Sequence, residues 1–157
     1  MTTEIFAKIG DIKGESLAAG HRDEIDVLSF SWGVANTGTT GAGGGSGAGR
    51  ATFRDLVIVH HIDNATPGLI LACATGRHLP QTTITHRIAG QREFLIIKLD
   101  DVTVTSVDHT GGEGQPYTES VSLRFAKVDL HYRKQRPDGT LDDGQHFTFD
   151  LKTHQPG

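Results

Sequence analysis

The sequence predicts a mainly β fold: an antiparallel β-barrel of about eight strands with one short flanking α-helix. Apolar and polar side chains alternate along most of the chain, which is the period of half-buried strands. A single apolar segment between a proline and a glycine departs from this period and is typical of a helix. The 157 residues show no internal repeat and no domain boundary, so we expect a single domain over 1–157.

Alternation marks the strands in chain order. We expect strands over Thr3–Ile9, Glu24–Gly33, Ala51–Ile62, Thr82–Ile88, Phe94–Val107, Tyr117–Lys134 and Phe147–Leu151. Within the sixth of these, the core-facing positions shift after Ala126–Lys127, which indicates a bulge. Ala89–Arg92 is predicted to be a hairpin turn and His109–Gln115 a loop.

The segment Asp63–Gly76 is predicted to contain the helix. Thr66 can cap its first free amides, Pro67 suits its first turn, and Gly76 suits a left-handed exit. The helix is apolar almost all round, so we expect it to be buried and to close one end of the barrel.

The strand Glu24–Gly33 is predicted to have two different faces. Leu28, Phe30 and Trp32 fall on one side, and Val27, Ser29 and Ser31 fall on the other. One side can therefore pack on a core while the other tolerates water, which suggests a wall with a wet face.

The glycine-rich segment Thr37–Arg50 follows this strand. It is not a phosphate loop, because it lacks Gly-Lys-Ser/Thr and because a β-rich segment, not a helix, comes after Arg50. We expect a flexible surface loop that orders against a neighbour.

Composition excludes several classes of partner. The formal net charge is −4, and the 15 Lys and Arg residues are scattered, which argues against nucleic acid and against a membrane surface. The longest apolar run, Leu69–Ala74, is too short to cross a bilayer. The first residues lack a basic start and an apolar run, so we expect no cleavable leader. With one cysteine, Cys73, no intrachain disulfide can form.

Residues that could carry chemistry are present but not in catalytic patterns. His60 and His61 face opposite sides of a strand and cannot share a metal; His131, His146 and His154 can approach one another only if the last two strands pair. The chain has no Gly-x-Ser-x-Gly motif, and Cys73 is expected to be a buried thiol. We therefore expect no metal, no cofactor and no enzymatic activity.

Several segments in order carry a family likeness. They are Phe6–Ser16, Glu24–Gly33, Gly47–Arg50, Asp63–Pro80 and Thr118–Lys127, with Tyr132. Together they resemble the Hcp family, the haemolysin-coregulated proteins of the type VI secretion system, over nearly the whole chain.

This resemblance implies a β-barrel with a flanking helix that forms a homo-hexamer. Its rings stack into a tube that a contractile sheath propels and that carries a trimeric spike protein. The rings can also bind small protein effectors in the lumen and chaperone them. The protein would leave the bacterial cytoplasm for the extracellular space or a target cell without a cleaved signal peptide.

On this basis we expect Val27, Ser29 and Ser31 to line the lumen and bind cargo. The ring-stacking contact is expected from Gly43, Gly44, Gly45, Ser46, Gly47 and Arg50. Two other interpretations remain open: a monomeric ligand-binding β-barrel, and a tail-tube protein of another contractile injection device. An enzyme would need titratable residues that converge in a pocket, and the sequence offers none.

Overall fold

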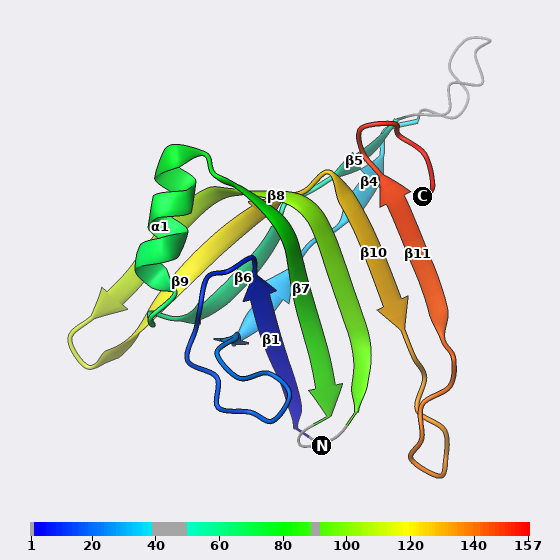
Figure 1. Ribbon diagram of the computed structural model, residues 1–157, viewed down its shortest axis with the longest axis horizontal. Coiled ribbons are helices and arrows are strands. Elements are labelled where there is room, and N and C mark those ends of the chain that lie inside the picture. Colours follow the sequence, from blue (N-terminus) through cyan, green and yellow to red (C-terminus); the bar gives the residue numbers. More distant parts are fainter. Residues whose placement is uncertain (1, 39–49, 89–91) are drawn as a thin grey trace.

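The computed structural model describes residues 2–38, 50–88 and 92–157 as a curved antiparallel sheet with a helix packed against it (Figure 1). The predicted mainly β fold is confirmed. The strands are β1 (Thr3–Ile9), β2 (Ile25–Val27), β3 (Ser29–Ser31), β4 (Val34–Asn36), β5 (Ala51–Phe53), β6 (Leu56–His61), β7 (His78–Ile88), β8 (Glu93–Gly112), β9 (Gln115–Arg124), β10 (Lys127–Tyr132) and β11 (Gln145–Asp150). The helix is α1 (Thr66–Thr75). The expected turn at Ala89–Arg92 lies mostly outside the described residues.

The main sheet has the order β2-β1-β7-β8-β9-β6-β3. Its two end strands, β2 and β3, are consecutive in the chain, and between them the amide of Leu28 donates to the carbonyl of Val59 at 2.7 Å. The sheet therefore curls until its ends approach, but β2 and β3 do not pair and the barrel is not closed by a continuous ladder. Strands β4 and β5 form a separate ribbon.

Strand β8 organises the rest of the sheet because its two halves hold different neighbours. Its second half pairs with β9 and its first half with β10, and β10 carries β11 at the edge. Thr103 lies opposite Arg124, and Asp100 opposite Lys127, so β9 and β10 follow one line along β8 with a break between them.

That break falls at Phe125–Ala126, where the sequence predicts a bulge. Phe125 and Val128 are both buried, which confirms the shift of core-facing positions. The predicted loop His109–Gln115 is wrong, because β8 continues to Gly112 and a tight turn leads into β9. Gly114 in that turn has a φ of 72°, a conformation that favours glycine.

The predicted strand Glu24–Gly33 is divided because its two parts pair with different neighbours. Residues of β2 pair with β1, and residues of β3 pair with β6. The side-chain direction changes at this junction: Val27 is 9% exposed and belongs to the core, whereas Leu28 is 53% exposed. The expectation that Val27 shares an open face with Ser29 and Ser31 is therefore wrong.

The helix begins and ends close to where the sequence predicts. Pro67 lies in the first turn, and Gly76 ends the helix in the left-handed conformation with a φ of 65°. The expected cap by Thr66 is wrong. Ala65 occupies the cap position without a side-chain hydrogen bond, and the hydroxyl of Thr66 bonds Asp63 and Glu119 instead.

The expectation that the helix is buried all round is also wrong for the single chain. Thr66, Leu69 and Ala72 are buried, but Ile70 is 43% exposed and Leu71 is 61% exposed. Cys73 is half-buried rather than enclosed. The core lies between the curved sheet and the inner side of this helix. Its largest fully buried side chains include Phe6, Ile9, Ile25, Leu56, Ile58, Leu69, Leu79, Ile84, Ile97, Leu99 and Leu123.

Candidate functional site

The short strand β3 presents two hydroxyl side chains to solvent. Ser29 and Ser31 are exposed, while Phe30 between them turns inward and packs edge-on against His86, with 4.4 Å between the ring centroids. This alternation is the one that the sequence predicts. Ser29 and Ser31 therefore share an open face, and among the described strands β3 pairs with β6 alone.

The pairing of β3 with β6, of β6 with β9 and of β9 with β8 extends this face across three further strands. Ser29 lies opposite Val59, and Val59 lies opposite Ser120; Asp108 of β8 ends this row. A second row runs parallel to it from Ser31 on β3.

In this second row Ser31 lies opposite Val57, which lies opposite Ser122 of β9, which lies opposite Ser106 of β8. The hydroxyl of Ser106 donates to that of Ser122 at 2.9 Å. We call this surface the hydroxyl face. It comprises Ser29, Ser31, Val57, Val59, Ser106, Ser120 and Ser122.

The hydroxyl face contains no charged residue and no long side chain. Alternation along β9 turns Val121 and Leu123 into the core, so Ser120 and Ser122 point the other way. Charged side chains border these seven residues: Asp108 ends one row, and Arg124 pairs with Asp55 at 3.5 Å. Such a surface is wet and offers short hydroxyl groups that can donate or accept hydrogen bonds.

Of the expected stacking residues, Gly43, Gly44, Gly45, Ser46 and Gly47 lie outside the described residues. Arg50 is described and exposed, directly before β5. Sequence reasoning finds the serines of β3, but it cannot place them on one face with those of β9, because β6 lies between the two strands.

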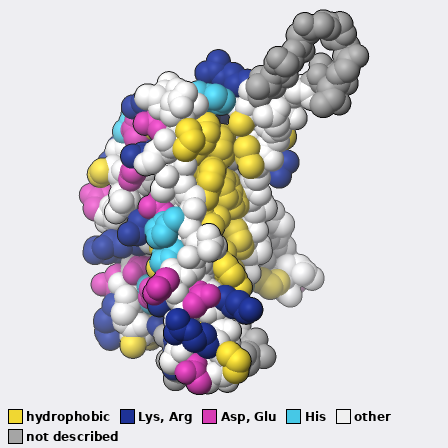
Figure 2. Space-filling model, turned by 90° about the vertical axis from the view of Figure 1, so that its right-hand side faces the viewer, with side chains coloured by type: hydrophobic (Ala, Val, Ile, Leu, Met, Phe, Trp, Pro, Cys, Tyr) yellow, Lys and Arg dark blue, Asp and Glu magenta, His cyan; other side chains and the backbone are white. Residues whose placement is uncertain are grey.

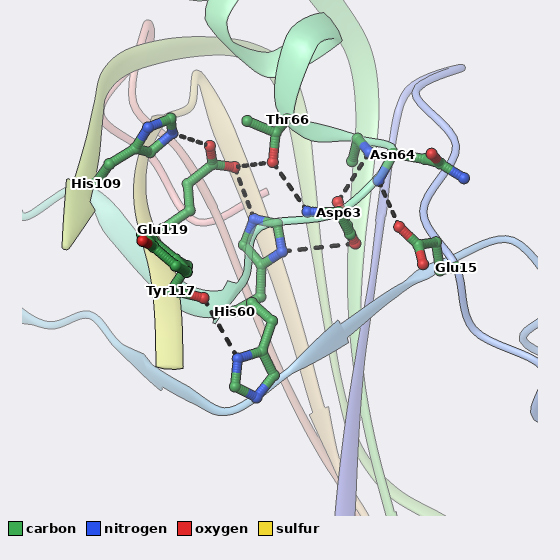
Figure 3. A network of polar contacts seen from close by, with 10 residues as sticks. Glu15, His60, Asp63, Asn64, Thr66, His109, Tyr117 and Glu119 are labelled. Carbon is green, nitrogen blue, oxygen red and sulfur yellow. Dashed lines mark hydrogen bonds and ion pairs between the residues drawn. The ribbon is translucent and has the colours of Figure 1, made fainter. Parts of the chain in front are cut away.

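A buried carboxylate lies on the core side of the same strands (Figure 3). Glu119 of β9 is fully buried, and a buried charge is costly unless it is paired and hydrogen-bonded. Its Oε1 lies 2.8 Å from Nε2 of His60 and accepts from the hydroxyl of Thr66 at 3.3 Å. Its Oε2 lies 2.6 Å from Nε2 of His109.

His60 is fully buried between two carboxylates. Its Nδ1 is 3.6 Å from Oδ2 of Asp63, on the side away from Glu119. Burial alone lowers the pKa of His60, but the nearby carboxylate of Asp63 and the hydrogen bond to Glu119 outweigh it and raise the pKa above its ordinary value. The network therefore ties β6, β8 and β9 to the start of α1 through charge-assisted contacts.

The buried groups of this network bond one another and join the strands to the helix. His60 is inward and His61 exposed, which confirms that they cannot share a ligand. Within the described ranges, no three His, Cys, Asp or Glu side chains are grouped as metal ligands. Glu119 escapes sequence reasoning, although its place on the core side of β9, between Tyr117 and Val121, is a signal for a paired buried acid.

The pairing of the last two strands brings His131 and His146 together. Their rings stack at 3.9 Å on β10 and β11, whereas His154 contacts Phe149 instead.

Across the described residues, no helix is long and apolar enough to span a membrane.

Comparison with known proteins identifies the class. The sequence model of the family described as "Type VI secretion system effector, Hcp" matches residues 6–132. The curated protein hcp1 of Pseudomonas aeruginosa is 47% identical over 149 residues, covering 92% of this chain and 91% of that protein.

Solved structures agree with this. A type six secretion system protein has a TM-score of 0.90 at 25% identity, covering 99% of this chain and 100% of that chain. Hcp1 from Salmonella typhimurium has a TM-score of 0.81 at 33% identity and covers 100% of both chains.

Fold and sequence thus define a protein of the type VI secretion class. Within that class, the chain belongs to the Hcp family. The resemblance inferred from the sequence is confirmed.

Proposed function

We propose that this chain is the tube subunit of a type VI secretion system, forming hexameric rings that stack into the inner tube. The observation that carries the proposal is the hydroxyl face together with the two strand edges that flank it. The similar proteins described above support it, since they are type VI secretion or Hcp proteins of matching length.

Ring closure needs two edges on opposite sides of one sheet segment. In the segment β3-β6-β9-β8, β3 pairs only with β6. At the other side, and within the described residues, the pairing of β7 with β8 ends at Thr103, so Val104–Gly112 pairs with β9 alone. Unpaired edges invite pairing with another chain, and a head-to-tail interface that closes makes a ring.

In such a ring the hydroxyl face would line the channel. Ser29, Ser31 and their neighbours are small and uncharged, so they leave room for cargo and let water fill the lumen. We propose that small protein effectors bind there and are chaperoned. The short hydroxyls suit varied cargo surfaces, because each can either donate or accept a hydrogen bond.

Assembly into a tube would add further partners. We propose that Gly43–Gly47 and Arg50 contact the next ring, and that a contractile sheath and a trimeric spike act on the stacked tube. The protein would pass from the bacterial cytoplasm to the outside through this machine without a cleaved leader, in a structural rather than an enzymatic role.

Negative-stain microscopy and native mass spectrometry of the purified protein test the proposal. We expect ring-shaped particles with a central hole and a mass of the hexamer. Single 16.9 kDa subunits at working concentration would instead favour a monomeric ligand-binding barrel.

A further inference from the structure

The outer side of α1 is an apolar surface that the single chain leaves uncovered. Pro67, Ile70, Leu71 and Ala74 are all exposed and recur at the spacing of one helical face. No residue of α1 is charged. A helix that is hydrophobic all round is normally buried, so this face indicates a contact that the single chain does not supply.

A hollow beside the helix continues this surface. It is lined by Ile70, Cys73, Ala74, Val107, Asp108 and His109. Val107 and His109 belong to the half of β8 whose far edge is unpaired. The helix face and the free edge therefore lie on the same side of the molecule.

A second apolar surface lies on the other side. We call it the aromatic seam; it comprises Trp32, Phe53, Phe147 and Phe149. The ring centroid of Phe53 is 5.0 Å from that of Phe149 and 6.4 Å from that of Phe147.

The seam is open to solvent at Phe147, whereas Trp32, Phe53 and Phe149 are half-buried and also pack against the core. Phe147 is 39% exposed, and β11, which carries Phe147 and Phe149, pairs with β10 and contacts the C-terminal residues through a bridge between Asp150 and Gln155. Figure 2 looks onto this side and shows a long band of hydrophobic side chains. Trp32 directly follows β3, so the seam adjoins the second free edge of the segment that we propose closes the ring.

We propose that the outer side of α1 in one copy packs on the aromatic seam of the next copy. This inference rests on the proposed ring and names its lateral contact. Figure 1 shows α1 and β11 toward opposite ends of the long axis, as a head-to-tail interface requires.

The sizes of the two surfaces match. The ten residues of α1 span about 15 Å at the usual rise of a helix. The six residues of β11 span about 20 Å at the usual rise of a strand. An uncharged helix face loses no charge hydration when aromatic rings cover it, so this pairing avoids the cost that a charged surface would carry.

Replacing Leu71 tests the contact. Leu71→Glu adds a charge at a site that is 61% exposed, where the single chain has room for it. By native mass spectrometry across a dilution series, we expect the variant to need at least about tenfold more protein to form rings. Leu17→Glu is the matched control, because Leu17 is 79% exposed and belongs to neither surface; it should assemble like the wild type.

The single native cysteine allows a second test. Cys73 lines the hollow beside α1, so Phe147→Cys would place a second thiol on the seam. In a head-to-tail ring a short bismaleimide should then join each copy to the next and yield a ladder up to the covalent hexamer on a denaturing gel. Phe147→Cys combined with Cys73→Ser should stop at dimers.

The outcomes separate the two proposals. A monomeric wild type would overturn the ring and this contact with it. A hexameric wild type whose Leu71→Glu variant assembles equally well, or whose Phe147→Cys variant gives no ladder, would overturn the contact alone. A different surface, or a different protein, would then cover α1.

Discussion

Replacing Glu119 with glutamine changes the charge of a fully buried side chain while keeping its shape. In the wild type its two oxygens face His60, Thr66 and His109. Glutamine keeps one carbonyl oxygen, which can still accept from His60 and Thr66. Its NH₂ group then replaces the oxygen that faces His109, so His109 loses its acceptor.

The magnitude follows from those contacts. Hydrogen bonds to charged groups contribute roughly 1.5–3 kcal/mol each, and breaking a buried ion pair by removing one partner costs roughly 3–5 kcal/mol. Because His109 is partly exposed and can regain water, and because glutamine keeps one acceptor, we expect the free energy of unfolding to fall by roughly 2–4 kcal/mol. That is a large share of the roughly 5–15 kcal/mol of a typical domain.

The loss should depend on pH in a definite direction. The pKa of His60 is raised in the fold above its ordinary value of 6.5. A raised histidine pKa adds stability that is fully present below the unfolded pKa and disappears as the pH rises through the folded pKa. The difference between wild type and Glu119→Gln should therefore be largest in mildly acidic buffer and should shrink above neutral pH.

Urea unfolding followed by the fluorescence of Trp32, the only tryptophan, measures both quantities. Curves at about pH 6 and about pH 9, at equal protein concentration, give the two free energies. Glu113→Gln is the control, because Glu113 is exposed in the turn of the same hairpin, and it should stay within about 0.5 kcal/mol of the wild type. Equal stability of Glu119→Gln and wild type, with coincident pH profiles, would refute the account of the network.

Three further outcomes are expected. Ser31→Trp should leave ring particles intact by microscopy but reduce co-purified effector, and unchanged retention would remove Ser31 from the cargo surface. Deletion of Gly43–Gly47 should weaken tube formation but leave hexamers by native mass spectrometry; loss of the hexamer would move this segment to the lateral contact. His86 is buried with neither ring nitrogen bonded to a protein group, and burial lowers its pKa, so its stability contribution is lost as the pH falls through its unfolded pKa near 6.5. His86→Phe should therefore flatten the acid side of the stability profile, as measured by thermal unfolding, and an unchanged acid slope would contradict this.

Features that depend on residues close together in the chain could be predicted from the amino-acid sequence alone. Alternation of side chains marked the strands, and the shift after Ala126 located the break between β9 and β10. Pro67 and Gly76 bounded the helix, because each has backbone preferences that do not depend on the rest of the fold. The family could be inferred because segments typical of it occur in the same order along most of the chain.

The pairing and register of the strands depend on contacts between distant segments, so they became known from the three-dimensional structure. Val27 and Leu28 change direction because β2 and β3 join opposite ends of a curled sheet, and no local pattern contains that information. Ser31 and Ser122 come to share one face through Val57, which is far from both in sequence. The open side of α1 is also a tertiary result. The apolar composition of the helix predicts burial on every side, but the sheet of a single chain covers only the inner side of the helix.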